Sequence, residues 1–431
     1  MRVIMDAHIH SHFSRATSSQ MNINDLALWA KYKGIDILGT GDFTHPFWFN
    51  ELKNKFQEDG SGLLKLKDKE EYSLSFLLST EISCIYSEGG KGRRIHLVIF
   101  APSFGDVTKI NHALEKIGNL YADGRPVFGL SAYQATKIIL EASPESIVIP
   151  AHIWTPWFSL FGSASGFDSI TECFKDLTPN IFALETGLSS DPPMNWRVSA
   201  LDQYALVSFS DSHSPGNLGR EAVVFEVKNK QALTFAKIKQ MLREANPIFR
   251  QKLNQPKEDF LAYTLEFFPE EGKYHFDGHR ACGVVLSPDE AKKLNNLCPK
   301  CHRPLTIGVM HRVMELSDRP EGFLPEKAVP FYSLIPLKEI IAQALNQDSK
   351  AKQVEKEYQL IVQSICPELP LLLDYPLEKV ENKVNPKIAQ YLKIMRQGKV
   401  IKMPGYDGVY GTIKVKEDKD ESTVFKQNSL F

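Results

Sequence analysis

The sequence Val3-Ile4-Met5-Asp6-Ala7-His8-Ile9-His10 joins a short apolar run to two histidines that are two residues apart. On a β-strand, residues i and i+2 share a face, so both imidazoles can reach one metal ion. Further segments with metal-ligand side chains follow short apolar runs: Gly41-Asp42-Phe43-Thr44-His45, Thr80-Glu81, Ile95-His96, Ala151-His152 and Ser210-Asp211-Ser212-His213. Because a closed parallel barrel gathers its strand ends around one mouth, this order predicts a barrel with a metal site there.

The side chains in these segments also indicate the kind of metal. Imidazole and carboxylate ligands together favour zinc, manganese or iron over calcium. The carboxylates of Glu81 and Asp211 can each bridge two ions, which a lone histidine cannot. Any single histidine of the set could be a hydrogen-bonded core residue instead, but the recurrence of such segments favours a metal cluster.

Strand-like and helix-like patterns alternate up to about residue 245, which favours an α/β barrel over an all-β or helical fold. The sequence predicts these strands: Val3–Ile9, Ile35–Gly39, Leu74–Ile85, Ile95–Phe100, Ser146–His152, Asn180–Thr186, Ala205–Ser210 and Val223–Val227. It predicts these helices: Asn24–Tyr32, which Gly34 ends, Tyr133–Glu141 and Thr234–Ala245.

The order of the six motifs resembles the PHP phosphoesterase family (polymerase and histidinol phosphatase). This resemblance implies a distorted (β/α)7 barrel with two or three divalent ions (Zn, Mn or Mg) at its mouth. It assigns one ion to His8, His10, Glu81 and Asp211, and a second to Glu81, His96 and His152, with Glu81 as the bridge. A third ion would use His213, His45 and Asp42.

Two departures from that family concern the third ion. Ser14, Arg15 and Ala16 stand where many members have another histidine, and Asp42 and His45 are three residues apart where many have them adjacent. The number of ions, two or three, therefore stays open.

Composition limits the other possibilities. The chain has 431 residues, 43% of them hydrophobic, which is enough for two or three domains. There is no apolar run of about 18 residues, so we expect no membrane span. Met1-Arg2-Val3 leads directly into the first strand, so we expect no signal peptide. Six cysteines with no regular framework indicate a cytoplasmic protein. Nothing demands more than a monomer.

A second metal motif follows a polar linker over Gln251–Glu271. His279-x-x-Cys282 and Cys298-x-x-Cys301 are separated by 15 residues, a spacing at which two short knuckles can hold one structural zinc. His302 and His275 are nearby substitutes for one ligand. A redox role for Cys298-x-x-Cys301 is the alternative, but no thioredoxin-like context surrounds it. We call the predicted zinc-binding unit the Cys/His module.

Basic residues cluster in this module and after it, although the net charge of the chain is −1. From Lys273 to Arg312 there are seven Lys/Arg and three Asp/Glu, and from Lys383 to Lys416 there are eight Lys/Arg and one acid, Asp407. A solvated helix face would explain one such run, whereas two runs favour contact with a phosphate backbone. The candidate contacts are Lys292, Lys293, Lys393 and Arg396. Predicted helices here are Pro336–Ala344, Ala351–Ile365 and Asn385–Gln397, with a strand at Val409–Val415.

These features divide the chain into a barrel (1–250), a linker with the Cys/His module (251–305), a basic helical DNA-binding region (306–415) and a disordered tail (416–431). The order of domains, the run CGVVLSPDEAKKLNNLCPKCHRPLTIGVMHRVMEL and the later PGYDGVYGTI are similar to the endonuclease Q family. That resemblance covers nearly the whole chain. His279 stands where the family usually has a fourth cysteine, and imidazole can replace thiolate at zinc.

The resemblance implies an enzyme that nicks DNA 5′ to a deaminated base (uracil, hypoxanthine or xanthine) or an abasic site. Metal-activated water would attack the scissile phosphate, and loss of Glu81 or Asp211 would abolish the reaction most completely. The alternatives are a small-molecule phosphoesterase of the histidinol-phosphatase type, which leaves the Cys/His module unexplained, and a non-catalytic DNA- or clamp-binding scaffold.

Two further segments suggest contacts with the substrate and a partner. A damaged base must leave the stack, and Trp154, Trp157 and Phe158 could provide its apolar wall, or could pack beneath a loop. The end of the chain resembles the Q-x-[SD]-L-F peptide that docks bacterial enzymes on the sliding clamp. Gln427, Leu430 and Phe431 would make the contacts, and the alternative is a disordered end.

Overall fold

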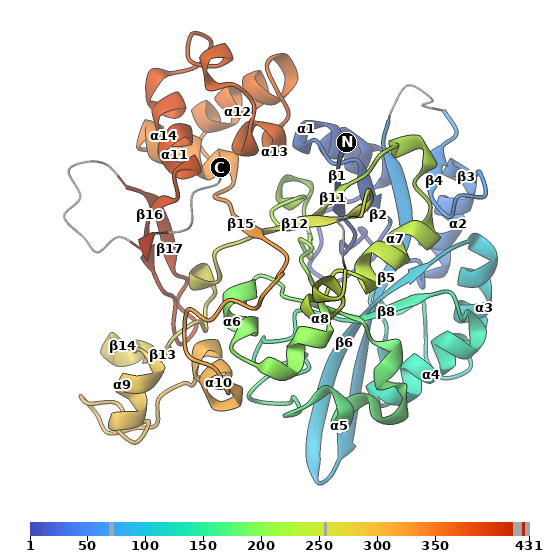
Figure 1. The fold of residues 1–431 in the computed structure, drawn as a ribbon, viewed down its shortest axis with the longest axis horizontal. Helices are drawn as coiled ribbons and strands as arrows, with labels where there is room; N and C mark the ends of the chain where they lie inside the picture. Colours follow the sequence, from blue (N-terminus) through green and yellow to red (C-terminus); the bar gives the residue numbers. More distant parts are fainter. Residues whose placement is uncertain (69–72, 254–256, 417–424, 427–431) are drawn as a thin grey trace.

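The computed structural model describes residues 1–68, 73–253, 257–416 and 425–426 (Figure 1). A ring of seven strands lies at its centre. These strands are β1 (Arg2–Asp6), β2 (Ile37–Gly39), β5 (Ser75–Glu88), β6 (Lys91–Ala101), β8 (Ile147–Pro150), β9 (Ala183–Glu185) and β10 (Ala205–Val207).

The pairing of these strands makes the ring a distorted barrel. β1, β2 and β5 are parallel neighbours, whereas β6 runs antiparallel to both β5 and β8. β9 and β10 form their own parallel pair, and β9 lies beside β8. A parallel bridge between Ile9 and Ser212 connects the end of β1 to the segment after β10. The predicted α/β fold class is confirmed, with one reversed strand in the ring.

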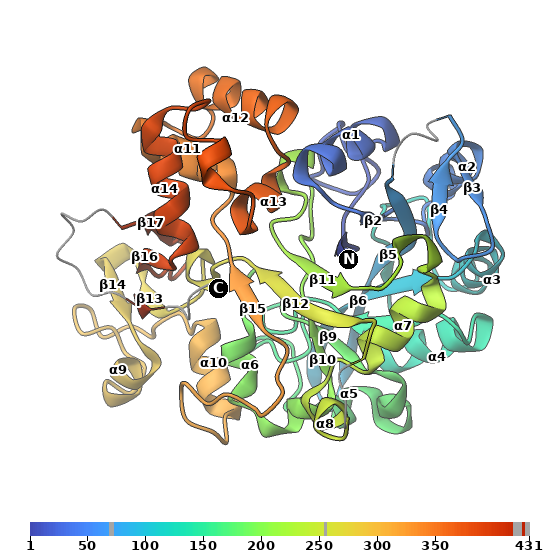
Figure 2. The ribbon, with the colours of Figure 1, turned by 45° about the horizontal axis from the view of Figure 1, so that its top comes forward.

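Helices cover the outside of the ring (Figures 1 and 2). They are α1 (Ile23–Lys33), α2 (Pro46–Lys55), α3 (Phe104–Glu115), α4 (Ala132–Ala142), α5 (Ile170–Phe174), α6 (Pro192–Trp196), α7 (Phe235–Arg243) and α8 (Pro247–Gln251). Local sequence fixes their ends. The Asn22 side chain accepts from the Asp25 amide at the start of α1, and Gly34 ends α1 with a φ of 78°.

The central sheet continues past residue 250. β11 (Ala222–Glu226) is antiparallel to β1, β12 (Phe260–Glu266) is antiparallel to β11, and β15 (Phe331–Ser333) is parallel to β12. The predicted barrel boundary at residue 250 therefore falls before two strands that extend the same sheet. Small strands are β3 (Phe56–Glu58), β4 (Leu64–Leu66) and β7 (Val127–Phe128).

Two smaller groups of elements lie beside the barrel. The Cys/His module contains β13 (Asp277–His279), β14 (Val284–Leu286) and α9 (Pro288–Lys293), and α10 (Val309–Leu316) follows it. It occupies the edge of the molecule away from α3 and α4 (Figures 1 and 2). The helical group consists of α11 (Leu337–Leu345), α12 (Lys352–Ser364), α13 (Glu368–Leu373) and α14 (Pro386–Arg396).

The last described strands are β16 (Lys399–Met403), β17 (Thr412–Val415) and β18 (Phe425–Lys426). β18 pairs with β16 in antiparallel register. The rest of the tail that was predicted to be disordered (417–424 and 427–431) lies outside the described residues. The predicted clamp-binding residues Gln427, Leu430 and Phe431 lie outside the described residues.

Short 3-10 helices connect the larger elements: η1 (Lys175–Asn180), η2 (Ser199–Gln203), η3 (Pro215–Asn217), η4 (Lys230–Ala232), η5 (Pro269–Glu271), η6 (Arg280–Cys282) and η7 (Leu377–Lys379). Of the helices in the described residues, none has the length and apolar character needed to cross a bilayer.

Candidate metal centre

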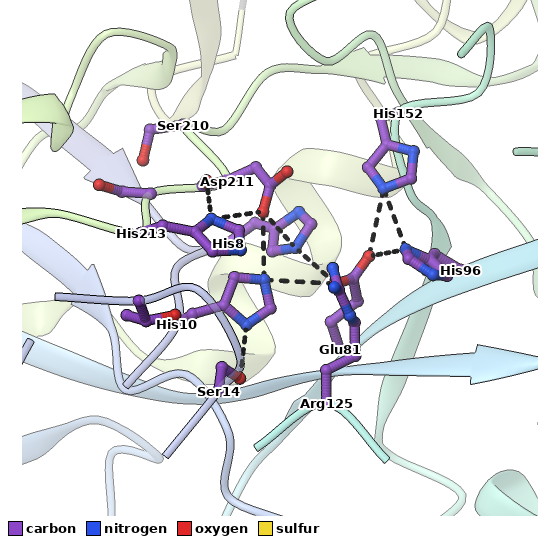
Figure 3. A network of polar contacts seen from close by, with 12 residues as sticks. His8, His10, Ser14, Glu81, His96, Arg125, His152, Ser210, Asp211 and His213 are labelled. Atoms are coloured by element: carbon purple, nitrogen blue, oxygen red, sulfur yellow. Dashed lines mark hydrogen bonds and ion pairs between the residues drawn. The ribbon is translucent and has the colours of Figure 1, made fainter. Parts of the chain in front are cut away.

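The histidines and carboxylates predicted from the sequence come together at one end of the ring. His8 and His10 follow β1, Glu81 lies within β5, and Asp211 follows β10. One ligand atom from each of these residues lies within 4.8 Å of the others, and Figure 3 shows their side chains pointing toward one another. His8, His10 and Glu81 are buried, and the Asp211 side chain is 25% exposed. The cluster is therefore shielded from solvent at His8, His10 and Glu81 and open to solvent at Asp211.

Carboxylates outside the cluster fix the two rings that follow β1. His8 donates from Nδ1 to Glu185 Oε1 at 2.8 Å, and His10 donates from Nδ1 to Asp42 Oδ1 at 3.0 Å. Each Nε2 is thereby left to face Glu81 and Asp211. The buried Nε2 of His8 has no hydrogen-bond partner among the described residues. A carboxylate behind a ring and a lone pair in front of it are the arrangement that metal-bound histidines have.

Glu81 is the centre of the arrangement because its two oxygens face different partners. Oε1 lies 2.6 Å from His96 Nδ1 and 3.2 Å from His152 Nε2. Oε2 lies 3.3 Å from His10 Nε2 and 2.9 Å from a guanidinium nitrogen of Arg125. Glu81, His96 and His152 thus form a second buried group of ligands, which shares its carboxylate with the first. The two predicted ligand sets with a bridging Glu81 are both assembled.

The charges of these groups suit metal binding. Burial would raise the pKa of Glu81, but His96 and Arg125 lower it well below its usual value. Burial lowers the pKa of His96 to about 4, so its ring is neutral at pH 7. Burial also lowers the pKa of His8, but Glu185 outweighs burial and raises it well above its usual value. Protons and metal ions therefore compete for His8.

The residues predicted for a third ion are arranged differently. Asp42 is occupied: besides His10, its carboxylate accepts from the Ser11 amide at 2.6 Å and the Ser14 hydroxyl at 2.9 Å. The His45 ring stacks on Phe13, with centroids 4.2 Å apart. His213 lies beside His10, with ring centroids 4.5 Å apart. Within the described residues, none of the three belongs to a group of converging ligands.

Three of the residues that shape this centre have backbones in the left-handed region. The φ angles are 48° at Asp42, 29° at His152 and 46° at Asp211. Such conformations are costly for residues other than glycine and persist where the surrounding structure enforces them. Their concentration here indicates that the turns after the strands are shaped to aim these side chains.

The predicted aromatic contacts separate into different environments. Trp154 is 1% exposed and donates to Asn195 Oδ1 at 2.8 Å, so it packs beneath the loop. Trp157 is 43% exposed and meets Tyr274 edge-on at 5.6 Å. The Phe158 ring lies 4.8 Å from that of His96. Trp157, Phe158 and Tyr274 line a cavity of about 730 Å³ beside the second ligand group.

The four predicted ligands of the Cys/His module also converge. The ligand atoms of His279, Cys282, Cys298 and Cys301 lie within 4.8 Å of one another. Burial would raise the pKa of Cys298, but backbone amides of Cys301 and Lys300 lower it to about 7. Three thiol groups and an imidazole are a donor set that suits tetrahedral zinc. His302 is exposed and His275 is stacked on Phe276, so neither belongs to this set.

The predicted DNA-contact cations also differ from one another. Lys292 and Lys293 on α9 and Lys393 on α14 are exposed. Arg396 donates to the carbonyls of Leu371 and Tyr375, the latter at 2.7 Å. Its guanidinium is therefore engaged in holding α13 against α14, which is a structural role.

Sequence reasoning missed two functional residues, Glu185 and Arg125. Glu185 ends β9, and its other oxygen accepts from the His152 amide at 2.8 Å, so it supports both ligand groups. Glu185 follows a short apolar run at the end of a strand, as the predicted ligands do, so the sequence could have identified it as a candidate. Arg125 comes from the loop before β7, where the sequence carries no motif. Only the fold brings it to Glu81.

Comparisons with known proteins agree with this arrangement. The model of the MJ0043 C-terminal domain family matches residues 336–399, which span the helical group. Protein MJ0043 of Methanocaldococcus jannaschii is 33% identical over 272 residues, 62% of this chain and 32% of that protein. The chain thus spans about a third of the length of that relative (32%).

Two solved structures are similar over almost all of the chain. The lesion-specific endonuclease PfuEndoQ from Pyrococcus furiosus is 29% identical, with a TM-score of 0.83 and 98% of each chain covered. An endonuclease Q in complex with a 27-mer duplex substrate, with an abasic lesion at its active site, is 30% identical. Its TM-score is 0.80, and the match covers 97% of this chain and 98% of that one. Because an identity of 30% extends over 98% of an endonuclease Q chain, the chain belongs to the endonuclease Q family.

Proposed function

We propose that this protein is a metal-dependent DNA repair endonuclease that nicks the phosphodiester bond 5′ to a deaminated base or an abasic site. The observation that carries the proposal is the shared carboxylate of Glu81, which joins two groups of converging ligands at the mouth of the ring. Paired metal sites of this kind serve in-line displacement at phosphate. The likeness to endonuclease Q structures over nearly the whole chain supports DNA as the substrate.

The residues of the centre would have different roles in the reaction. Divalent ions bound there would supply a water nucleophile at neutral pH and neutralise charge on the scissile phosphate. Glu185 and Asp42 hold the His8 and His10 rings in the tautomer that presents Nε2. Arg125, whose side chain is 28% exposed, can donate to a phosphate oxygen at the open side. The Asp211 side chain is 25% exposed and so also lies at the open side.

Lesion selectivity would come from the cavity beside the second ligand group. Deaminated bases pair weakly, and an abasic nucleotide pairs with nothing, so each leaves the duplex at lower cost than a normal nucleotide. Trp157, Phe158 and Tyr274 give the cavity aromatic walls that can stack on an extruded nucleotide. Its volume of about 730 Å³ is in the range of small-molecule sites.

Partners and cofactors beyond the metal centre follow from the same proposal. We expect one structural zinc in the Cys/His module, and contacts between the phosphate backbone and Lys292, Lys293 and Lys393. The protein would act as a monomer on DNA in the nucleoid. The C-terminal residues Gln427, Leu430 and Phe431, with their sequence likeness to clamp-binding peptides, suggest docking on the sliding clamp.

The decisive experiment uses end-labelled duplexes that carry one uracil, one hypoxanthine, one abasic site or no lesion, with manganese, magnesium or zinc. We expect a single nick 5′ to each lesion, no cleavage of the undamaged duplex, and no nick with Asp211→Ala. Intact DNA under every condition, together with turnover of a small phosphate ester, would assign the centre to a small-molecule phosphoesterase instead.

A further inference from the structure

Four aromatic rings, none of which lines the cavity of Trp157, gather beside segments of the metal centre. The His45 ring stacks on Phe13 with centroids 4.2 Å apart and an angle of 23° between the planes. Phe47 and Tyr121 meet edge-on at 5.6 Å, and His45 lies 5.9 Å from Phe47 and 6.4 Å from Tyr121. We call these residues (Phe13, His45, Phe47 and Tyr121) the aromatic platform.

The outer members of the platform are turned to solvent. Phe47 is 61% exposed and Tyr121 is 54% exposed, whereas His45 beneath them is 4% exposed. Large aromatic rings held in place by a packed base, with their outer faces uncovered, are typical of a binding surface.

Each segment that carries a member of the platform also carries a residue of the metal centre. Phe13 is three residues after the ligand His10. His45 and Phe47 follow Asp42, which holds the His10 ring, and the His45 amide donates to the Asp42 carbonyl at 2.9 Å. Tyr121 precedes Arg125, which binds Glu81. The platform and the metal centre are therefore built from the same segments of the chain.

The orientation of Glu81 places the platform on a definite side. Oε1 faces His96 and His152, next to Phe158 and the lesion cavity. Oε2 faces His10 and Arg125, whose loops carry the platform. A phosphate bound over Glu81 would thus have the cavity on one side and the platform on the other. If the cavity takes the lesion nucleotide, the platform faces the nucleotide on the 5′ side of the scissile phosphate.

Charge near the platform suits a nucleic-acid strand. Arg15 is exposed and Arg125 is partly exposed. The nearby carboxylate of Asp123 is turned toward backbone amides, since its Oδ1 accepts from Arg125 at 3.0 Å and from Arg15 at 3.3 Å. Cations beside an aromatic surface are the combination that single-strand binding sites use.

We propose that the aromatic platform stacks on the base of the nucleotide 5′ to the scissile phosphate and holds that nucleotide out of the duplex. The proposal deepens the endonuclease function and rests on it. By gripping the strand on both sides of the phosphate, the protein would fix the bond for in-line attack. The occupant is a nucleobase, because an exposed aromatic surface with arginines beside it matches a base and its phosphates.

The test is photochemical cross-linking of the full-length Asp211→Asn protein, which should bind without nicking, to a duplex with one abasic site. A 5-iododeoxyuridine is placed on the 5′ side of the scissile phosphate, or on the 3′ side of the lesion as a positional control. We expect cross-links to Phe47 or Tyr121 from the 5′ position alone, located by mass spectrometry. Substitutions Phe47→Ala and Tyr121→Ala should remove them and weaken binding by about tenfold each.

Control variants and metal analysis separate stacking from folding. Phe47→Tyr should retain the cross-link because it keeps an aromatic ring, and Leu360→Ala, an exposed apolar residue on α12, should change nothing. DNA that binds normally without a cross-link at Phe47 or Tyr121 would overturn the platform and leave the endonuclease standing. Loss of metal from Phe47→Ala, or a dimer that this substitution dissociates, would also overturn the proposal.

The same experiment distinguishes failure of the underlying function. If the Asp211→Asn protein cross-links at the platform but the wild-type protein nicks no lesion, the endonuclease function is refuted. The platform would then stand as a nucleotide-binding surface. A protein that binds no DNA in any form would overturn both.

Discussion

At the scale of single residues, Glu185 has the clearest consequence for the metal centre. Its two oxygens bind His8 Nδ1 and the His152 amide, so one carboxylate positions residues of both ligand groups. Such supporting carboxylates orient the ring and raise its basicity toward the metal. The effect of Glu185 should therefore appear in metal affinity before it appears in folding.

We expect Glu185→Gln to weaken metal binding by about 10- to 100-fold, because an amide is a poorer acceptor for the imidazole N–H. Competition with a chromogenic chelator would measure this affinity. The matched control is Glu226→Gln. It makes the same change at an exposed carboxylate that pairs with the amino group of Met1. Equal affinities of Glu185→Gln and the wild-type protein would show that His8 does not depend on this contact.

The neighbouring tryptophans Trp154 and Trp157 should respond differently to substitution. Trp157→Ala should weaken binding to lesion DNA by about tenfold and leave stability unchanged, because its ring is largely exposed at the cavity. Trp154→Phe should cost roughly 1–3 kcal/mol of stability by leaving Asn195 Oδ1 unpaired, without changing lesion preference. Chemical denaturation and anisotropy titrations measure the two effects. Undiminished lesion binding by Trp157→Ala would contradict the stacking role.

At the scale of elements, β12 places a buried acid, Glu266, in the central sheet. Glu266 accepts from the hydroxyls of Thr264, Thr186 at 3.0 Å and Ser208 at 3.1 Å. Burial raises the pKa of Glu266 from 4.5 to about 8. It is therefore neutral in the folded protein at pH 7 and ionised in the unfolded chain.

Since the folded state binds the extra proton, the contribution of Glu266 to stability is complete below about pH 4.5 and is lost as pH rises through about 8. Burial also raises the pKa of Glu271 to about 8, so it acts in the same direction. We expect the melting temperature to fall between pH 5 and pH 8. Glu266→Gln should flatten this fall. An equally steep profile in the variant would place the responsible proton elsewhere.

The elements also show why sequence patterns predicted some of the fold and missed the rest. The ends of β8 and β10 were predicted two and three residues too late, because His152 and Asp211 lie in left-handed turns, whereas β5 and β6 extend beyond the ranges predicted for them. Helices α2 and α3 were missed. The Ser103 side chain caps α3 by accepting from the Asp106 amide, a local signal that was present in the sequence.

At the scale of the whole molecule, the C-terminal region folds back on the Cys/His module. The Arg280 amide and the Thr306 hydroxyl both donate to Asp407, and Phe276 forms a bridge with Tyr406. Segments more than 100 residues apart are joined in this way, which neither composition nor motif spacing predicts. The ligand groups themselves were predictable, because they lie at strand ends, whereas Arg125 and the aromatic platform required the folded chain.

This packing gives the predicted zinc a role beyond its own loop. We expect Cys298→Ser to lose one metal ion per chain and to lower both the stability and the affinity for DNA, because the ligand is buried and its module supports the C-terminal strands. Elemental analysis counts the ions. His302→Ala, at an exposed neighbour outside the ligand set, is the control. Retention of the ion by Cys298→Ser would contradict the assignment.

The divided carboxylate of Glu81 has one more consequence, which concerns cooperativity. An ion bound on the His10 side would draw electron density from the carboxylate that the His96 side also uses, so we expect occupancy of one position to lower the affinity of the other. Calorimetric titration of the metal-free protein should then resolve a tight and a weak phase. In a cell where the metal is scarce, most of the protein would hold one ion, and the supply of the second ion would set the fraction of active enzyme.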